Sequence, residues 1–300
     1  MRPTVPLAFA LALLTGCNGK SGPAGAASAD AATPGTGGGH DCASAKAQGA
    51  SEGGPADDVL GIRPGMRPAA AKALVACANA KYVIQMNTAE SGGGGDFSTP
   101  SYPHTPYPIG SLSAFIRPPQ SEEMKKAIAS GNSSAVMALE GQQPPNPDEI
   151  HVTFAGPPGA ETVGLIKRTL NYNNQSRPLL QKVTDGLIQK YGQPSARGTW
   201  GYNGSPEFDW VYDPSGAPMS QENPAYGICV GNMTNEANVL NEACGVTIVA
   251  RIGVDTSTGD PAVGSLDVWS ANQSAAKAAV ARATAAINAM NAPSGSAPNL

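Results

Sequence analysis

Histidine is the side chain best suited to acid–base chemistry near neutral pH, and this chain has three, His40, His104 and His151. A histidine-based hydrolase would use His104, in a proline-rich stretch, or His151, among alternating apolar residues, since His40 lies among glycines. The sequence has no Gly-x-Ser-x-Gly elbow between an expected strand and helix, no His-Glu-x-x-His zinc motif and no Gly-x-x-x-x-Gly-Lys-Ser/Thr phosphate loop. We therefore assign no catalytic residue, cofactor or metal, and keep a histidine-based hydrolase as the alternative.

A cysteine near the N-terminus has the sequence context of an acylation site. The chain begins with Met1-Arg2, continues with an apolar run from Val5 to Leu14, and reaches Leu14-Thr15-Gly16-Cys17. A positive start, a short apolar segment and small residues before the cut are the parts of a signal peptide. The tetrapeptide resembles the lipobox of bacterial lipoproteins, which implies cleavage before Cys17 and attachment of palmitate-type chains to its thiol and new amino group. An ordinary secreted protein, cut at Ala27-Ser28-Ala29, is the alternative.

The same resemblance implies a location. Two or more acyl chains anchor a protein stably to a membrane. Asn18 follows the cysteine, where an Asp would resemble the inner-membrane retention signal. We therefore expect an outer-membrane lipoprotein that faces the periplasm. From residue 18 to about residue 54 the chain is rich in Gly, Ala and Ser and has almost no large apolar residue, which predicts a disordered tether.

Four further cysteines allow two disulfides in an oxidising compartment, with three possible connectivities. They are Cys42, Cys77, Cys229 and Cys244. We favour Cys229–Cys244, because the flanking segments look like neighbouring antiparallel strands, which leaves Cys42 to pair with Cys77 in the first expected helix. Metal binding is the alternative, although no Cys-x-x-Cys pair or nearby histidine pair accompanies these cysteines.

Aromatic residues concentrate in one segment of a chain whose aromatic content is only 5%. Trp200, Tyr202, Trp210 and Tyr212 are the candidate binding surface, because an exposed aromatic strip can stack on sugar rings or hold a protein partner. Phe208, Trp210 and Tyr212 alternate at period two, however, which is more typical of the inner face of a sheet. The core is therefore the favoured alternative for this strip.

Charge and composition exclude two classes of function. The formal net charge is −4, and no cluster of Lys and Arg could neutralise a row of phosphates, so we expect no nucleic-acid partner. No run of eighteen apolar residues follows the first fifteen positions, which predicts no membrane-spanning helix. With 36 Gly and 27 Pro many residues must lie in loops, and about 230 residues remain for a folded region.

Hydrophobic periodicity predicts the elements that would position these residues. Helices are expected at 69–80, from Ser121, at 178–191 with Ser176 as its cap and Gly192 as its stop, and at 274–291. Strands are expected at 82–86, 113–116, 150–154, 163–172, 208–212, 244–254 and 263–269. Because strand pairs and helices are segregated rather than alternating, we expect an α+β fold with a mainly antiparallel sheet.

Breaks in this pattern divide the chain, and Gln142–Pro147 is the expected boundary between two subdomains. The expected division is a signal peptide at 1–16, a lipidated tether at 17–54, a small α+β subdomain with a Pro/Gly-rich loop at 55–147, an α+β subdomain with an antiparallel sheet at 148–292, and a tail at 293–300.

Two longer segments also carry resemblances. Gly61-Ile62-Arg63-Pro64-Gly65-Met66 resembles the helix-opening motif of the SmpA/OmlA envelope lipoproteins, although Arg67-Pro68 replaces the polar cap usual there. This resemblance implies an envelope-assembly or protein-binding role. Ile166-Lys167-Arg168, the segment Leu187–Pro194 and the paired cysteines resemble a family of uncharacterised proteobacterial exported proteins, which implies no activity.

These observations together predict a membrane-anchored, periplasm-facing lipoprotein that binds another envelope component, either a protein or peptidoglycan. The alternative is a periplasmic hydrolase that acts on cell-wall or small-molecule substrates.

Overall fold

The computed structural model of this chain describes residues 42, 55–87, 110–140, 144–157, 159–173, 176–201, 204–234, 240–255 and 261–291. The expected signal peptide, with Cys17, and most of the expected tether lie outside these residues, as does the expected tail. Among the described residues, no helix is long and apolar enough to cross a membrane.

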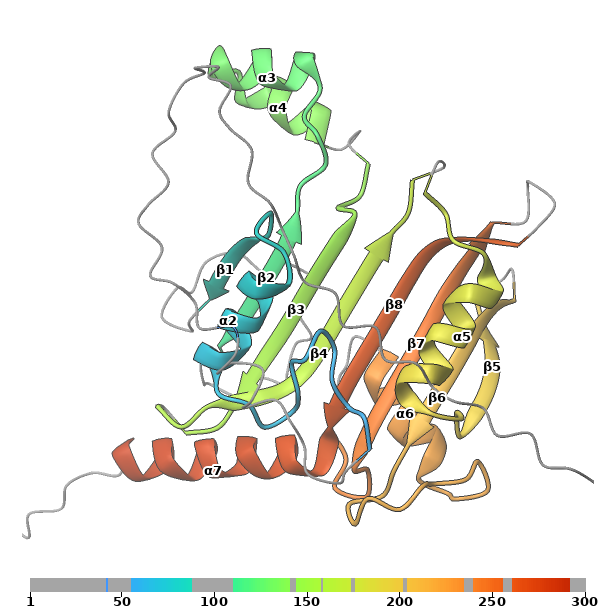
Figure 1. Cartoon of the computed structure of the whole chain (residues 1–300). Coiled ribbons are helices and arrows are strands. Elements are labelled where there is room, and N and C mark those ends of the chain that lie inside the picture. Colours follow the sequence, from blue (N-terminus) through green and yellow to red (C-terminus); the bar gives the residue numbers. More distant parts are fainter. Residues whose placement is uncertain are drawn as a thin grey trace, which may run out of the picture. The chain divides into compact units, whose positions relative to one another are not determined.

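The described strands form one eight-stranded antiparallel sheet, which confirms the expected α+β fold (Figure 1). Its strand order is β1-β2-β3-β4-β8-β7-β6-β5, so β4 and β8 lie side by side at the centre of the sheet. The segments with alternating apolar residues form strands as the sequence predicted, except around Cys229. The strands are β1 (Val83–Asn87), β2 (Ser111–Ile116), β3 (Asp148–Ala155), β4 (Thr162–Asn171), β5 (Ala196–Trp200), β6 (Ser205–Val211), β7 (Val246–Asp255) and β8 (Ala262–Asn272).

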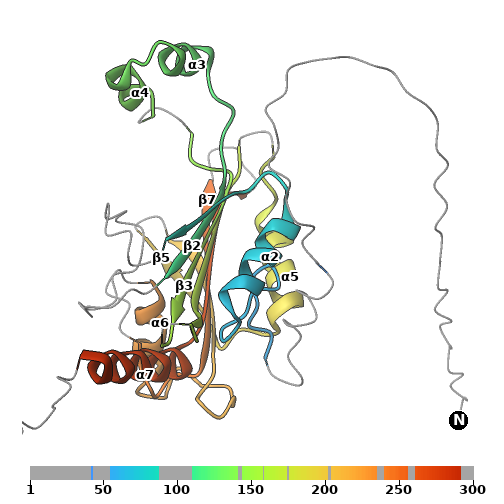
Figure 2. The same ribbon diagram turned by 90° about the vertical axis from the view of Figure 1, so that its left-hand side faces the viewer.

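Helices cover both faces of this sheet (Figure 2). We call first face the side that packs against α2 (Pro68–Ala78) and α5 (Leu180–Tyr191), and second face the side that packs against α6 (Tyr226–Thr234) and α7 (Gln273–Asn291). The main hydrophobic core lies on the first face, where Leu74 of α2 and Leu187 of α5 meet sheet residues such as Ile248. Smaller clusters under α6 and α7 bury one end of the second face.

Two further helices, α3 (Glu122–Ala129) and α4 (Ser133–Glu140), lie between β2 and β3 in the chain and pack against each other. The helix expected from Ser121 is confirmed, and the hydroxyl of Ser121 caps it by accepting a hydrogen bond from the backbone N–H of Met124 at 3.1 Å. Met124 is buried in this helix pair, whereas Met137 is 73% exposed.

The two halves of the chain repeat one arrangement of elements. A helix and four antiparallel strands run from α2 to β4, and a second set runs from α5 to β8. The cross-strand pairs Ile150–Arg168 and Phe154–Val163 of β3 and β4 recur as Ala250–Val268 and Val254–Val263 of β7 and β8, a shift of 100 residues in both of these strands. Each hairpin also has its register shift at the same place, after Thr153 and after Gly253. The fold is therefore an internal duplication.

The two halves meet along β4 and β8 with two-fold symmetry. Arg168 pairs with Val268, its own counterpart in the other half, and the pairs Leu165–Ala271 and Asn171–Ser265 lie three residues to either side. The local dyad thus passes beside Arg168 and Val268. The expected boundary after residue 147 does not divide the structure, because β2 and β3 pair across it and one compact unit runs from Gly39 to Leu300.

Two local expectations need correction, and two short elements were missed. Leu179, and not Ser176, precedes the first turn of α5, and it makes no side-chain cap; Gly192 ends the helix at φ 83°, as expected. Helix α6 was expected as strand, because its residues include two glycines and several apolar side chains that gave no helical period. The short helix α4 and the strand β5 were not predicted.

Both favoured disulfides are present in the structure. Cys42 is joined to Cys77 of α2 with a Cα–Cα distance of 5.8 Å, and Cys229 is joined to Cys244 with a Cα–Cα distance of 5.6 Å. The cysteines of the second pair do not lie on neighbouring strands as expected, because Cys229 lies in α6 and Cys244 lies just before β7. The bond therefore joins a helix of the second face to the strand beneath it.

Candidate functional site

The candidate site lies on the second face, at the end that α6 and α7 do not bury. Strand pairing aligns one residue from each of six neighbouring strands into a line, which we call the polar row. Its residues are partly exposed, whereas Thr247, Ala271 and Leu165, which lie nearer α6 and α7 on the same face, are buried. The polar row consists of Phe115, Glu149, Thr169, Asp267, Arg251 and Glu207.

Arg251 links the polar row to two tryptophans. Its guanidinium carbon lies 5.4 Å from the ring centroid of Trp200 and 5.6 Å from that of Trp269. Its Nε donates to Glu207 Oε2 at 2.5 Å, which holds the guanidinium between the rings. The ammonium of Lys167 also lies 5.4 Å from the Trp269 centroid. Partly desolvated cation–aromatic contacts of this kind stabilise by roughly 1 kcal/mol each.

Only one described residue of the predicted aromatic surface, Trp200, lies partly exposed on the second face. Tyr202 lies outside the described residues. Trp210 is a correction: it is fully buried on the first face, where its ring packs 5.3 Å from that of Tyr191 and its indole N–H donates to Gly192 O at 2.9 Å. Tyr212 packs against the same core, and burial raises the pKa of its hydroxyl. Period two predicted this core position correctly, because alternate strand residues share a face.

His151 stands in a chain of three hydrogen-bonded side chains on the second face. Its Nδ1 lies 3.1 Å from the Oγ of Ser113, and its Nε2 lies 2.7 Å from Oε1 of Glu149. This histidine's side chain is only 11% exposed, and that of Glu149 is 29% exposed. The hydrogen bond from His151 holds the pKa of Glu149 below its usual value. His40 and His104 lie outside the described residues.

Asp209 is the most unusual titratable group of the second face. The residue is 5% exposed, and the hydroxyl of Tyr226 in α6 donates to its Oδ2 at 3.3 Å. Its other oxygen, Oδ1, is buried without a hydrogen-bond partner. Burial, reinforced by the negative charge of Glu207, raises the pKa of Asp209 to about 7. Sequence reasoning missed this residue, although Glu207 and Asp209 alternate with Phe208 and Trp210 and so had to share the opposite face.

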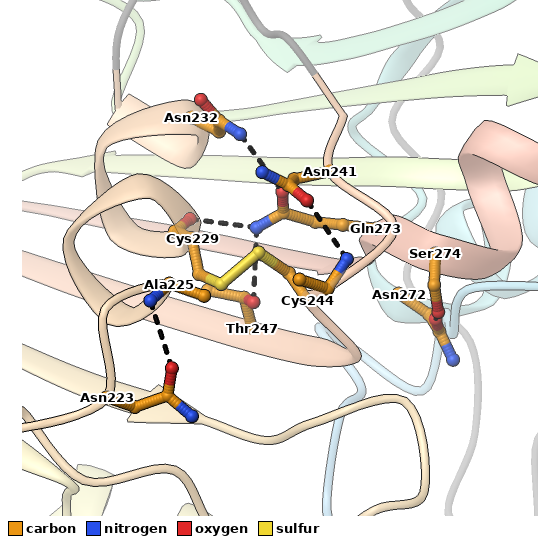
Figure 3. The surroundings of a disulfide bond; sticks show 11 residues. Asn223, Ala225, Cys229, Asn232, Asn241, Cys244, Thr247, Asn272, Gln273 and Ser274 are labelled. Carbon is orange, nitrogen blue, oxygen red and sulfur yellow. Dashed lines mark hydrogen bonds between the residues drawn. A yellow bond between two sulfur atoms is a disulfide. The ribbon is translucent and has the colours of Figure 1, made fainter.

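The helix that covers Asp209 is held in place by the disulfide Cys229–Cys244 and by Gln273 (Figure 3). Both cysteines and Gln273 are fully buried. The amide of Gln273, at the start of α7, donates to Cys229 O at 2.8 Å and to Thr247 Oγ1 at 3.2 Å. One buried side chain thus ties α6 and α7 to β7.

The first face also contains a group of polar side chains, and this group has a structural role. Arg168 donates to both oxygens of Asp148 at 3.0 and 2.8 Å, and the hydroxyl of Tyr82 donates to the same carboxylate at 2.5 Å. These hydrogen bonds compensate the burial of the Arg168–Asp148 ion pair, which lies on the face of the sheet that packs against α2. Within the described part of the chain, no group of three or more His, Cys, Asp and Glu side chains could hold a metal ion.

No protein-family model, curated protein or solved structure matches this chain. Its function must therefore be inferred from its own residues and their geometry.

Proposed function

We propose that this protein is a membrane-anchored lipoprotein of the outer membrane that faces the periplasm and binds another component of the cell envelope through its second face. The membrane anchor in this proposal rests on the sequence of the first seventeen residues, which ends in Leu14-Thr15-Gly16-Cys17. The two disulfides support an oxidising compartment such as the periplasm.

The polar row and its two tryptophans carry the binding proposal. The residues of the polar row and Trp200 are partly exposed and Trp269 is 9% exposed, and together they combine one arginine and two tryptophans with acidic neighbours. Tryptophan and arginine are enriched among the residues that contribute most to protein–protein binding. A surface that is already ordered also costs little conformational entropy when a partner binds.

A protein partner fits this surface better than peptidoglycan does. Sugar rings bind tryptophan by stacking on a free ring face. In this structure Arg251 lies over the rings of Trp200 and Trp269, and Lys167 lies over that of Trp269. A sugar would have to displace these cations, whereas acidic groups of a protein can pair with them where they are.

Site-specific photocrosslinking in cells can test this proposal. Gly198 lies on β5 beside Glu207 and is exposed, and a Cβ added there would meet open space, so a crosslinking amino acid fits at this position. Gly186 offers a matched control, because it is exposed on α5 above the opposite face and also has open space at its Cβ. We expect one reproducible crosslinked protein from position 198 and not from position 186.

A second variant connects the crosslink to the site. Trp200→Ala, combined with the crosslinker at position 198, should reduce the yield of that product at least about tenfold, in line with the loss of an interface tryptophan. Identical sets of proteins from positions 198 and 186, or a product that Trp200→Ala leaves unchanged, would contradict binding through the second face.

A further inference from the structure

The side chains of Ser113, His151 and Glu149 have the order of a nucleophile, a base and a carboxylate that orients the base. A carboxylate only accepts hydrogen bonds, so the Nε2 of His151 must carry the proton of the 2.7 Å contact with Glu149. In the neutral imidazole Nδ1 is then an acceptor, and the hydroxyl of Ser113 donates to it. This is the tautomer that a general base requires.

The sheet holds the three residues in this arrangement. Ser113 of β2 and His151 of β3 are direct cross-strand partners, and Glu149 lies two residues before His151 on the same face. Groups on paired strands are held more precisely than groups on loops. Ser113 is 8% exposed and the side chain of His151 is 11% exposed, so packing restricts both side chains further.

The neighbouring strand supplies the remaining parts of a reactive site. Gln85 of β1 is the cross-strand partner of Ser113 on its other side, and it is exposed. A glutamine amide beside the nucleophile can donate to the oxyanion that forms during acyl transfer. The next pair along the same strands, Val83–Phe115, is apolar; Arg117 lies over the Phe115 ring, so the exposed Val83 leaves only a small surface for an acyl group.

We propose that Ser113, His151 and Glu149 form a second, catalytic site on the second face, which hydrolyses short-chain carboxylic esters. This activity goes beyond the binding role proposed above and does not depend on it. Ser113 is the nucleophile, His151 is the general base and acid, Gln85 stabilises the oxyanion, and Glu149 is a positioning residue. The small apolar pair Val83–Phe115 limits the acyl group to a short chain.

The reaction balances with water as the only other reactant. Ser113 Oγ attacks the ester carbonyl carbon while its proton moves to Nδ1 of His151. The tetrahedral intermediate then breaks the bond to the alcohol oxygen, which leaves with the proton from Nδ1, and Ser113 stays acylated. Water attacks the acyl carbon and gives its proton to Nδ1, and the acid is released as Ser113 Oγ takes the proton back. Throughout these steps Nε2 keeps its hydrogen bond to Glu149.

Two measurements on the purified full chain test this proposal. The first is labelling with a fluorophosphonate, which phosphonylates activated serines, with the modified residue identified by mass spectrometry. The second is hydrolysis of p-nitrophenyl acetate. We expect label on Ser113, and we expect Ser113→Ala to lower the rate of hydrolysis at least about 100-fold, the size of a general-base contribution. His151→Asn should abolish the label and lower the rate equally.

Ser111→Ala is the matched control, because Ser111 lies on β2 on the same face and pairs with Thr153 rather than with a histidine. It should leave label and rate unchanged, and the thermal melting of each variant shows that it is folded. If His151→Asn does not fold, Glu149→Gln takes its place as the second variant. An unlabelled Ser113, or a Ser113→Ala variant that hydrolyses the ester at the original rate, overturns the proposal. The binding proposal would survive either result, since its readout is the crosslink at position 198.

Glu149→Gln also separates positioning from mere structural support. It should reduce kcat and leave KM and the melting temperature unchanged, because the imidazole loses the carboxylate that orients it. A rate that falls only together with the melting temperature would show that Glu149 only supports the fold.

Discussion

Replacing Asp209 with asparagine should remove a large part of the dependence of stability on pH. Asp209 lies under α6, 5% exposed, with Oδ1 unpartnered and Oδ2 bonded only to Tyr226. Its pKa is raised from 3.8 to about 7 in the folded protein, chiefly by burial. Asparagine has the same shape and no charge, so it keeps the contact with Tyr226 and cannot ionise.

The sign of the effect follows from the raised pKa of Asp209. In the unfolded chain this carboxyl loses its proton near pH 4, whereas in the folded protein it keeps the proton until about pH 7. The free energy of unfolding therefore falls between these pH values and stays low above them. A raised pKa of this size corresponds to about 4 kcal/mol in total, of which roughly 2.5 kcal/mol is lost between pH 5 and pH 9.

The assay is urea unfolding at pH 5, 6, 7, 8 and 9, followed by far-UV circular dichroism with both disulfides intact. The free energy of unfolding of Asp209→Asn, minus that of the original protein, should rise by roughly 2.5 kcal/mol from pH 5 to pH 9, and mostly below pH 7. Asp185→Asn is the control, because Asp185 is an exposed carboxylate on α5, and its profile should run parallel to the original. A parallel profile for Asp209→Asn would refute the reasoning.

Two further outcomes are expected from the structure, and a third from the sequence around Cys17. Trp210→Ala should lower the free energy of unfolding by about 3–5 kcal/mol, because it leaves a cavity at a fully buried site. Trp200→Ala should lower it by roughly 1 kcal/mol, because Trp200 is partly exposed, and urea unfolding measures both values. Replacing Cys229 and Cys244 together by serine should cost about 3 kcal/mol in the same assay, since the loop that the bond closes spans 15 residues. Cys17→Ser should move the protein from the membrane fraction to the soluble fraction, and intact-mass spectrometry of the original protein should show acyl chains on Cys17.

The strands of the sheet could be predicted from the sequence because each strand is recognisable from its own residues. Strands such as β3 and β7 alternate apolar and polar residues, and that pattern depends only on which face is buried. Helix α5 was recognisable from its apolar spacing and from Gly192 at its end. Helix α6 was missed because Gly227 and Gly231 lower its helix propensity, and its packing on β7 through Cys229 determines its conformation instead.

The candidate site depended on information that no local pattern contains. Ser113 and His151 are 38 residues apart, and they meet only because β2 and β3 pair in one register after the chain has passed through α3 and α4. In the same way, Arg251 reaches Trp200 only across β6. The duplication was equally hidden, because few side chains repeat between the halves, although Leu74 and Leu187 bury the same helix face in both.

The pairing of β4 with β8 has a consequence for each half of the chain. Separated at the connection between β4 and α5, the first half would keep its helix α2 and its four strands but would leave one side of β4 without hydrogen-bond partners. An unprotected strand edge of this length seeks another strand. Since the pairing of β4 with β8 is symmetric about Arg168 and Val268, β4 of a second copy of this half could pair in the place of β8 with the register unchanged. Such a fragment should form a two-fold symmetric dimer in which the β4 edges of the two copies pair. The full chain then has the arrangement of such a dimer, with its two halves covalently linked.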